Sequence, residues 1–239
     1  MQYPGGKNGS GVYQTLINQI PPHDVYIEGF LGSGAIMRRK RLARWSVGID
    51  KDSAVLEMWR EIKKGFRLGG NITLLNDDTI EFLESRGRGY VVTGAGRMLN
   101  KKSTLLYLDP PYLMETRSCR RPIYNHEMSD SDHERLLEII TGLRCMVMIS
   151  GYYSEMYVQA LDGWRAIQYP AQTRGGRTVT EWAWMNYPEP TQLHDYSYLG
   201  DDFRERERIK RKRERWVNRL LTLPPLEKAA IIEALQTIE

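Results

Sequence analysis

The tetrapeptide Asp109-Pro110-Pro111-Tyr112 brings together three groups that can hold a planar amine. The lone pair of an aromatic amine is delocalised into its ring, which makes the amine a poor nucleophile. Two acceptors, the Asp109 carboxylate and the Pro110 carbonyl, can each accept a hydrogen bond from one of its N–H groups and so localise that lone pair. The rigid Pro-Pro backbone holds the carbonyl in place. The Tyr112 ring can stack on an extruded base. The alternative is a tight loop with a capping Asp.

A glycine-rich segment, Glu28–Gly34 (EGFLGSG), lies between a predicted strand and a predicted helix. Glycines at such a turn let the backbone approach a ligand and enter the helix N-terminus. The segment departs from the dinucleotide fingerprint GxGxxG. By itself it is compatible with several nucleotide ligands or with a plain turn.

Two acidic positions and one lysine add to these motifs. Asp50 ends an apolar run about twenty residues after the first glycine, which suits two ribose hydroxyls, although a surface carboxylate is the alternative. Asp78 closes the run Asn76-Asp77-Asp78, where it can accept a hydrogen bond from a cofactor amine or cap the next helix. Near the start, Tyr3-Pro4-Gly5-Gly6-Lys7 lacks the spacing of a phosphate-binding loop, so Lys7 can instead meet a ligand carboxylate.

Short apolar runs alternate with segments of helical period, which predicts a mainly parallel sheet covered by helices. Ligands of such sheets bind at the carboxyl ends of the strands, where the motifs fall. The last two runs read as an antiparallel pair joined through TRGGR. The predicted strands are Val25–Glu28, Trp45–Ile49, Asn71–Leu75, Ser103–Leu108, Met146–Ser150, Trp164–Tyr169 and Thr178–Tyr187.

Helical period predicts four helices in the body, one of them capped by Asp130 or Ser131. Two further segments read as excursions from the sheet: 85–102, rich in Gly and Arg, and the polar loop 113–130. The predicted helices are Ala35–Ala43, Ser53–Lys64, Ile80–Glu84 and a helix that runs to Thr141.

The composition changes after Pro188, which divides the chain into a body (1–187), a linker (188–202) and a helical tail (203–239). Between Arg204 and Arg219 there are nine Lys or Arg against three Glu, although the whole chain carries only +4. This basic helix is either a solvated helix or an element that binds a nucleic-acid backbone through Lys210, Arg211, Lys212 and Arg213.

The closing helix, Leu226–Ile238, has an apolar face that would dock on the body or form a homodimer. No apolar run approaches the roughly 20 residues that span a bilayer, and the first residues resemble no signal or transit peptide. We therefore expect a cytoplasmic protein with two reduced cysteines, Cys119 and Cys145. His126 and His133 are too far apart for a metal-binding helix pair, so we expect no metal.

The order YPGGK, FLGSG, acidic strand end and DPPY resembles the Dam-type DNA adenine-N6 methyltransferases over roughly residues 2–187. The resemblance implies a class I methyltransferase fold, an α/β fold whose seven-stranded, mostly parallel sheet has an antiparallel last strand. It also implies S-adenosyl-L-methionine as cofactor and methyl transfer to N6 of an extruded adenine in DNA. Enzymes of N4-cytosine typically begin the tetrapeptide with Ser, and glutamine-directed enzymes with Asn, so Asp109 favours adenine.

Carried over by position, the resemblance gives each motif a role. Asp109, Pro110, Pro111 and Tyr112 would hold the target base, with Asp109 also bordering the cofactor. The cofactor would be bound at its methionine end by Tyr3 and Lys7, in its pocket by Phe30, Gly32 and Gly34, at its ribose by Asp50 and near its adenine by Asp78.

The chain departs from the family in having little room for a target-recognition region between Asp50 and Asp109. We therefore expect a short recognition site or low specificity. Recognition would fall to 85–102 and 113–130, where Arg117, Arg120 and Arg121 would contact phosphates or guanine edges unless they are solvated surface side chains.

The compact body resembles phage and prophage versions of the family. That resemblance places the protein at the nucleoid of a bacterial or phage-infected cell, either alone or as the modification partner of a restriction nuclease. The alternatives are methylation of RNA adenine or of N4 of cytosine, and a non-catalytic nucleic-acid-binding protein on the same scaffold.

Overall fold

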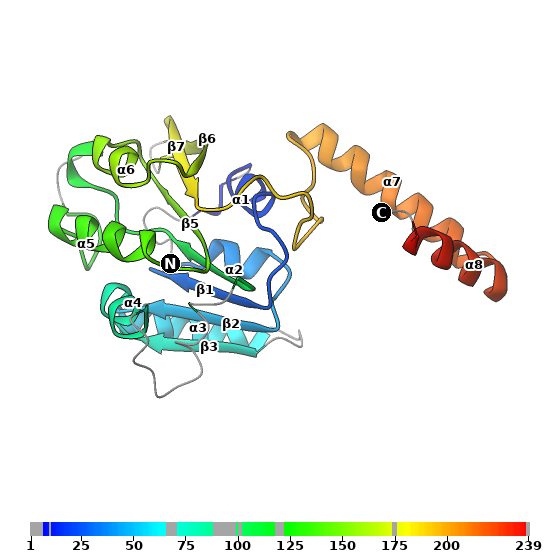
Figure 1. The fold of residues 1–239 in the computed structure, drawn as a ribbon, viewed down its shortest axis with the longest axis horizontal. Helices are drawn as coiled ribbons and strands as arrows, with labels where there is room; N and C mark the ends of the chain where they lie inside the picture. The colour runs from blue at the N-terminus through cyan, green and yellow to red at the C-terminus, as the bar shows by residue number, and fades with distance from the viewer. Residues whose placement is uncertain are drawn as a thin grey trace. The chain divides into compact units, whose positions relative to one another are not determined.

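A computed structural model describes residues 7–9, 11–65, 71–87, 99, 102–117, 122–173 and 176–237 (Figure 1), without the side chains of 63–65 and 86–87. The chain divides into two compact units, Met1–Tyr196 and Ser197–Glu239. The division lies within the predicted linker. The part of that linker before it belongs to the first unit, where His194 N donates to the Ile20 carbonyl and Arg41 N donates to Asp195.

Seven strands form one sheet in the order β3-β2-β1-β4-β5-β7-β6. Strands β1 to β5 are parallel, and β7 runs antiparallel to both of its neighbours. All seven predicted strands and the predicted fold class are therefore confirmed. The strands are β1 (Val25–Gly29), β2 (Trp45–Asp50), β3 (Asn71–Asn76), β4 (Thr104–Leu108), β5 (Met146–Gly151), β6 (Arg165–Gln172) and β7 (Thr178–Met185).

Burial along the strands follows their place in the sheet. Every residue of the central strands β1 and β4 is buried, because helices cover both faces, and both strands read as nearly continuous apolar runs. The edge strand β6 alternates between more exposed and more buried residues instead, as expected where one face meets solvent.

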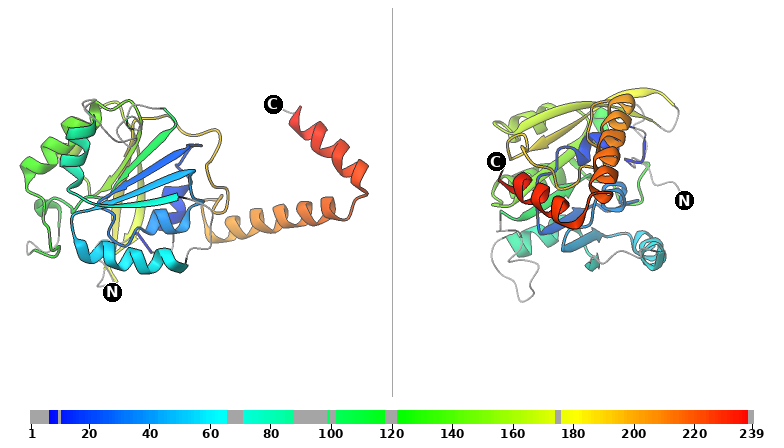
Figure 2. Two further views of the ribbon diagram at one scale, coloured as in Figure 1. Left: turned by 90° about the horizontal axis from the view of Figure 1, so that it is seen from below. Right: turned by 90° about the vertical axis from the view of Figure 1, so that its right-hand side faces the viewer.

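Helices pack on both faces of the sheet (Figure 2, left). One face carries α4 (Thr79–Gly87), α5 (Asp130–Thr141) and α6 (Glu155–Ala160), which lie side by side. The other carries α1 (Val12–Ile17), α2 (Ala35–Arg39) and α3 (Ser53–Gly65).

The structure corrects the predicted helices in three respects. Helix α2 ends before Ala43, because Lys40 already has an extended backbone. Ser129, and not Asp130 or Ser131, caps α5: its hydroxyl accepts from Asp132 N, and the Asp132 carboxylate accepts from Ser129 N. The six-residue helices α1 and α6 escaped prediction, because they are too short to show a helical period, and so did the 3-10 turn η1 (Met114–Thr116).

The main core lies between the sheet and α4 to α6. Alternate residues of the strands face these helices, so one side of each strand contributes to this core and the other faces α1 to α3. The side chains that fill the core include Ile27, Ile49, Phe82, Leu83, Leu106, Leu108, Leu136, Ile140, Val147, Ile149 and Trp184.

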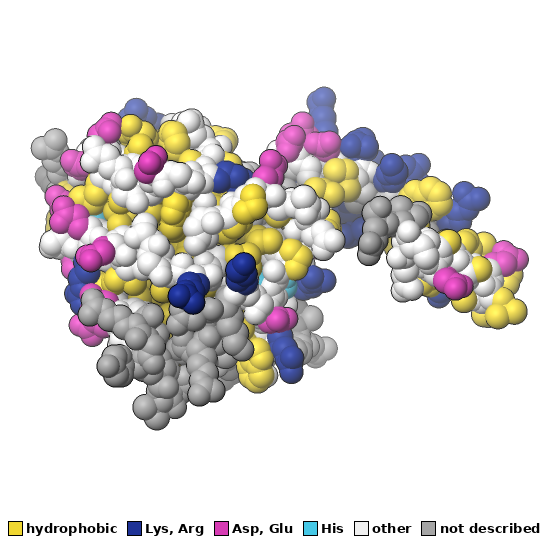
Figure 3. Space-filling model, in the orientation of Figure 1, with side chains coloured by type: hydrophobic (Ala, Val, Ile, Leu, Met, Phe, Trp, Pro, Cys, Tyr) yellow, Lys and Arg dark blue, Asp and Glu magenta, His cyan; other side chains and the backbone are white. Residues whose placement is uncertain are grey.

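The second unit consists of α7 (Phe203–Leu221) and α8 (Pro225–Gln236). Asp202 caps α7 by accepting from Glu205 N, and Lys and Arg side chains lie along the helix (Figure 3). The predicted apolar face of the closing helix is wrong, because apolar residues lie all round α8. Dimerisation through α8 stays a prediction. No helix in the described ranges is long and apolar enough to cross a membrane.

The turn before α2 gives a stability prediction. Gly34 has a φ of +55°, and a Cβ there would lie 2.0 Å from the Trp59 ring. We expect Gly34→Ala to lower the free energy of unfolding by about 3 kcal/mol, since backbone strain adds to a clash with a buried ring.

Gly163→Ala is the matched control. Gly163 also has a positive φ, +79°, but a Cβ there meets no atom within 4 Å. Only backbone strain of about 1 kcal/mol is expected for it. Urea denaturation of both variants checks the difference, and equal losses would contradict this account of the turn.

Candidate active site

One pocket lies at the carboxyl ends of β1, β2 and β4. It brings together all the described residues that the sequence motifs predicted for a cofactor and a target base; Tyr3 lies outside the described residues. The predicted residues that line it are Lys7, Phe30, Gly32, Gly34, Asp50, Asp78, Asp109, Pro110, Pro111 and Tyr112.

The glycine-rich turn is fixed by bonds to its neighbours. Gly32 N donates to Asp50 Oδ2 at 2.8 Å, and the Gly32 carbonyl accepts from Trp59 Nε1 at 3.0 Å. Phe30 has a φ of +54°, which is unusual for a residue with a side chain, and its N donates to Thr79 Oγ1 at 3.1 Å. These hydrogen bonds therefore fix the conformation of the turn along one wall of the pocket.

Asp50 ends β2 and is 6% exposed. Its carboxylate accepts from Gly32 N and from Asp52 N at 2.8 and 2.9 Å. Burial raises the pKa of this carboxyl, while the two backbone N–H groups oppose the shift. Each oxygen keeps a second lone pair, so Asp50 can accept further hydrogen bonds from hydroxyls in the pocket.

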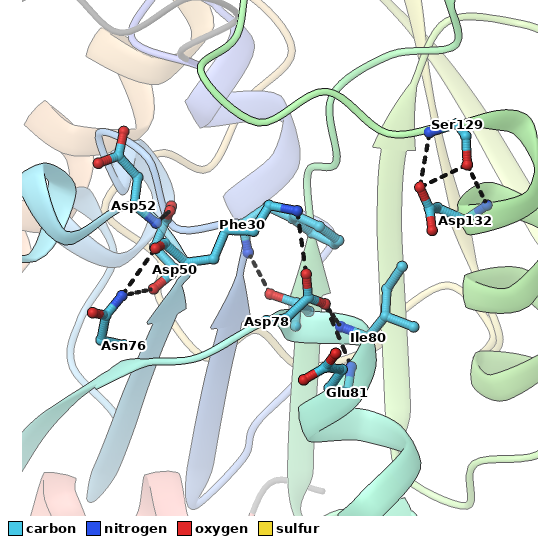
Figure 4. Close-up of polar contacts among 11 residues, drawn as sticks. Phe30, Asp50, Asp52, Asn76, Asp78, Ile80, Glu81, Ser129 and Asp132 are labelled. Carbon is cyan, nitrogen blue, oxygen red and sulfur yellow. Dashed lines mark hydrogen bonds and ion pairs between the residues drawn. The ribbon is translucent and has the colours of Figure 1, made fainter.

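Asp78 combines the two roles that its sequence position suggested (Figure 4). Its Oδ1 accepts from Ile80 N at 2.8 Å and so caps α4, while the side chain lines the pocket. Its Oδ2 accepts from Lys51 Nζ at 3.2 Å. The α4 cap therefore fixes this carboxylate where a ligand amine can reach it.

Glu28, near the end of β1, is a second buried acid on the pocket wall. It accepts from the Tyr26 hydroxyl at 2.8 Å and from Met37 N at 2.9 Å. Burial raises its pKa to about 8, although both hydrogen bonds oppose the shift. Glu28 joins β1 to α2 across the pocket floor.

Lys7 lies beside the tetrapeptide and is 3% exposed. Its ammonium donates to Asp109 Oδ1 at 2.6 Å and to the Tyr112 hydroxyl, and lies 3.4 Å from Glu181 Oε2. The lysine that the sequence assigned to a ligand carboxylate thus pairs with two carboxylates of the protein. Contact with the methionine end of a cofactor stays a prediction.

The electrostatics of Asp109 depend on this lysine. Burial raises the Asp109 pKa, and the Lys7 charge opposes the shift. Burial lowers the pKa of the Lys7 ammonium, but Asp109 and Glu181 outweigh burial and leave that pKa above its ordinary value. Lys7 therefore stays charged and favours the ionised form of Asp109.

Two neighbours of the Lys7–Asp109 pair had no local signal in the sequence. Ser150 on β5 donates to Asp109 Oδ1 at 2.9 Å, and its hydroxyl also meets the Tyr107 hydroxyl. Glu181 lies on β7 and accepts from Tyr169 at 3.1 Å. Both residues come close only because β5 and β7 follow β4 in the sheet.

Aromatic side chains surround the tetrapeptide. The Tyr112 ring is 6% exposed and lies 4.5 Å from the Tyr152 ring, with the Lys7 ammonium 4.9 Å from its centroid. Nearby, Tyr153 packs against Trp182 at 5.5 Å and is itself exposed. These rings offer apolar surface beside Asp109.

Arg117 requires a correction. It was predicted to contact DNA, but its side chain is buried and donates to the Tyr112 carbonyl and to the Glu127 carboxylate. Its role in this structure is to hold the loop after the tetrapeptide. That loop also brings Tyr124 and His126 to the pocket, a role that sequence reasoning missed.

The remaining predicted contacts cannot be placed at the pocket. Arg120 and Arg121 lie outside the described residues, as does most of 85–102. Within the described ranges, no three His, Cys, Asp or Glu side chains form a group suited to a metal ion. The four basic residues predicted to bind DNA, Lys210, Arg211, Lys212 and Arg213, lie on α7 in the second unit.

Neither a protein family nor a curated protein matches the sequence. Several solved structures are similar at low identity. A candidate methyltransferase from Escherichia coli is 16% identical, with a TM-score of 0.48, over 79% of this chain and 92% of its own. A candidate methyltransferase from Streptococcus mutans, solved in complex with SAH, is 14% identical, with a TM-score of 0.45, over 72% and 94%.

A candidate RNA methyltransferase from Pyrococcus horikoshii is 12% identical, with a TM-score of 0.47, over 77% of this chain and 85% of its own. Structural similarity at this low identity and TM-score supports no conclusion about the reaction or the substrate.

The Lys7 cluster gives a second stability prediction. Lys7→Met leaves Asp109 buried without its counter-charge, so we expect a loss of about 3–5 kcal/mol at pH 8. The loss should be smaller at pH 5. Without Lys7 the pKa of Asp109 rises further, and protonation then removes the unpaired charge as pH falls.

Lys51→Met is the control, because Lys51 pairs with Asp78 at a partly exposed position and should cost less than about 1 kcal/mol at either pH. Denaturation of both variants at the two pH values measures these effects. A loss for Lys7→Met that is small or independent of pH would argue against the buried ion pair.

Proposed function

We propose that this protein is an S-adenosylmethionine-dependent methyltransferase that methylates N6 of adenine in DNA. The observation that carries the proposal is the position of Asp109. It lies at the end of β4, held by Lys7 and Ser150, on the same pocket as Asp50 and the glycine-rich turn.

The residues on the pocket fit such a cofactor. Asp50 has free lone pairs for the two hydroxyls of a ribose, and the backbone of the glycine-rich turn can approach the ligand closely. Phe30 and Asp78 border the same pocket and would meet an adenine ring and its amine. When bound, S-adenosylmethionine supplies an electrophilic methyl group.

The tetrapeptide then prepares the amine for attack. Asp109 accepts one N–H of the adenine amine and the Pro110 carbonyl accepts the other, which localises the nitrogen lone pair. The proton released after transfer passes to water, so no general base is required. Lys7 favours the ionised form of Asp109, which accepts a hydrogen bond.

A flipped base also needs an apolar support. Tyr112 borders the pocket, and its ring is fixed from one side by Tyr152 and at its hydroxyl by Lys7. Stacking on such a ring does not depend on base sequence. Asp109 and Pro110 therefore select a base with an exocyclic amine that donates two hydrogen bonds, and the preference for adenine over cytosine rests on the resemblance of the tetrapeptide to adenine enzymes.

Helix α7 would supply the non-specific part of DNA binding. Between Arg204 and Arg219 it carries nine Lys or Arg against three Glu. Two of the glutamates pair within the helix, Glu205 with Arg208 and Glu207 with Arg211. The surplus of positive charge suits a phosphate backbone, and α7 would supply affinity without sequence selectivity.

Replacing Asp109 tests the proposed reaction. We expect Asp109→Ala to lower the rate of methyl transfer to DNA by at least about 10³-fold, because the hydrogen-bond acceptor of the amine is lost. Affinity for S-adenosylmethionine, measured by calorimetry, should change little. Asp162→Asn, an exposed loop position, is the control. Turnover retained in Asp109→Ala would disprove this mechanism.

Replacing Lys210, Arg211, Lys212 and Arg213 together with Gln tests the role of α7. The salt dependence of DNA binding should become shallower by about one unit of logarithmic slope for each lost phosphate contact. The rate at saturating DNA should stay the same. Lys228→Gln on α8 is the control, and an unchanged slope in the fourfold variant would show that α7 does not bind DNA.

A further inference from the structure

We call the segment Ile123–Glu127 the bridging turn. The tetrapeptide forms the target-base half of the pocket, and Asp50 with the glycine-rich turn forms the cofactor half. Tyr124 and His126 line the pocket, and the next residue, Met128, is buried in the core. The reaction proposed above gives this turn no role, yet it is bonded to both halves.

Glu127 closes the turn on itself. One oxygen of its carboxylate accepts from Ile123 N at 2.7 Å and from Tyr124 N at 3.0 Å. The same carboxylate pairs with Arg117 through two donors, at 2.9 and 2.6 Å. Burial raises the pKa of Glu127, but these hydrogen bonds outweigh burial and lower it overall, so Glu127 is ionised.

Arg117 connects the turn to the target-base half. Its Nε donates to the Tyr112 carbonyl at 2.7 Å, while its guanidinium carbon lies 5.0 Å from the Tyr124 ring centroid. The side chain is buried, so this guanidinium has a defined position between two partners. A single group therefore fixes both the last residue of the tetrapeptide and the bridging turn.

Asn125 connects the turn to the cofactor half. Its Nδ2 donates to Asp52 Oδ2 at 2.9 Å, and Asp52 N donates to Asp50 Oδ1 at 2.9 Å. Asp52 also caps the start of α3 through Ala54 N. His126 lines the same pocket as Asp50.

We propose that the bridging turn binds the cofactor through Tyr124 and His126 and couples cofactor binding to target-base binding. A ligand that shifts the backbone of Tyr124 also shifts Glu127, because Tyr124 N donates to its carboxylate. Glu127 carries Arg117, and Arg117 holds Tyr112. Arg117 and Glu127 are thus positioning residues, and the coupling is reciprocal. The inference rests on the proposed function, since it assigns the two halves to cofactor and base.

Calorimetry with S-adenosylhomocysteine tests the coupling. Its affinity is measured alone and with saturating DNA or RNA oligonucleotides of one adenine-containing sequence. We expect DNA to tighten its binding to the wild type by about 10-fold, and by less than about twofold in Glu127→Gln. Glu115→Gln, an exposed acid of the same loop, should keep the wild-type ratio.

Asn125→Ala guards against a variant that fails to fold. Asn125 is exposed, and its loss takes one hydrogen bond from Asp52, whose carboxylate still accepts from Ala54 N. The melting temperature should fall by only a few degrees, because a single hydrogen bond contributes about 1 kcal/mol. Affinity for S-adenosylhomocysteine should fall by about threefold and the coupling ratio should drop with it.

An unchanged coupling ratio in both variants would overturn the inference, even if S-adenosylhomocysteine bound more weakly. The inference would also fail if neither oligonucleotide changed the affinity of the wild type for S-adenosylhomocysteine. Failure of the proposed function is a different result: the wild-type protein would then transfer no methyl group to the same DNA. Coupling to the RNA oligonucleotide alone would uphold the bridge and reassign the substrate.

Discussion

The candidate site depends on one buried ammonium group. Lys7 lies between Asp109 and Glu181, and a buried carboxylate is costly unless a charge of opposite sign is near. The pairing joins three distant parts of the chain: its N-terminal segment, the end of β4 and the strand β7. It also favours the ionised form of Asp109, which is the state that accepts a hydrogen bond from an amine.

The two acids at the carboxyl edge are held in different ways. Asp50 is held by two backbone N–H groups, so the remaining lone pairs of its carboxylate can accept hydrogen bonds from a ligand. Asp109 is held by a side-chain ammonium and a hydroxyl, so its charge is balanced before any ligand arrives. This difference suits a ribose at the first acid and a reacting amine at the second.

The sequence predicted the sheet well because each strand is a short apolar run, which can be recognised from neighbouring residues alone. It also located Asp50, Asp78 and Asp109, since each lies at the end of such a run or within two residues after it. Helices α1 and α6 were missed, because six residues show no period. The glycine-rich turn was located from its residues, but its bonds to Trp59 and Thr79 were not.

The features of the site that the sequence did not predict depend on contacts between segments that are distant in the chain. Glu181 reaches Lys7 only through the position of β7 beside β5, which no local pattern encodes. Arg117 reads as a surface residue in a polar loop, and only its carbonyl and carboxylate partners explain its burial. Tyr124 and His126 line the pocket although they lie twelve and fourteen residues beyond Tyr112 in the sequence.

Mass spectrometry of nucleosides tests the central claim most directly. Unmethylated DNA and RNA of matched sequence are incubated with the protein and S-adenosylmethionine, and then digested. The account predicts N6-methyladenine in the DNA. N4-methylcytosine in place of it, methylation of the RNA alone, or no modified nucleoside despite bound cofactor would contradict it.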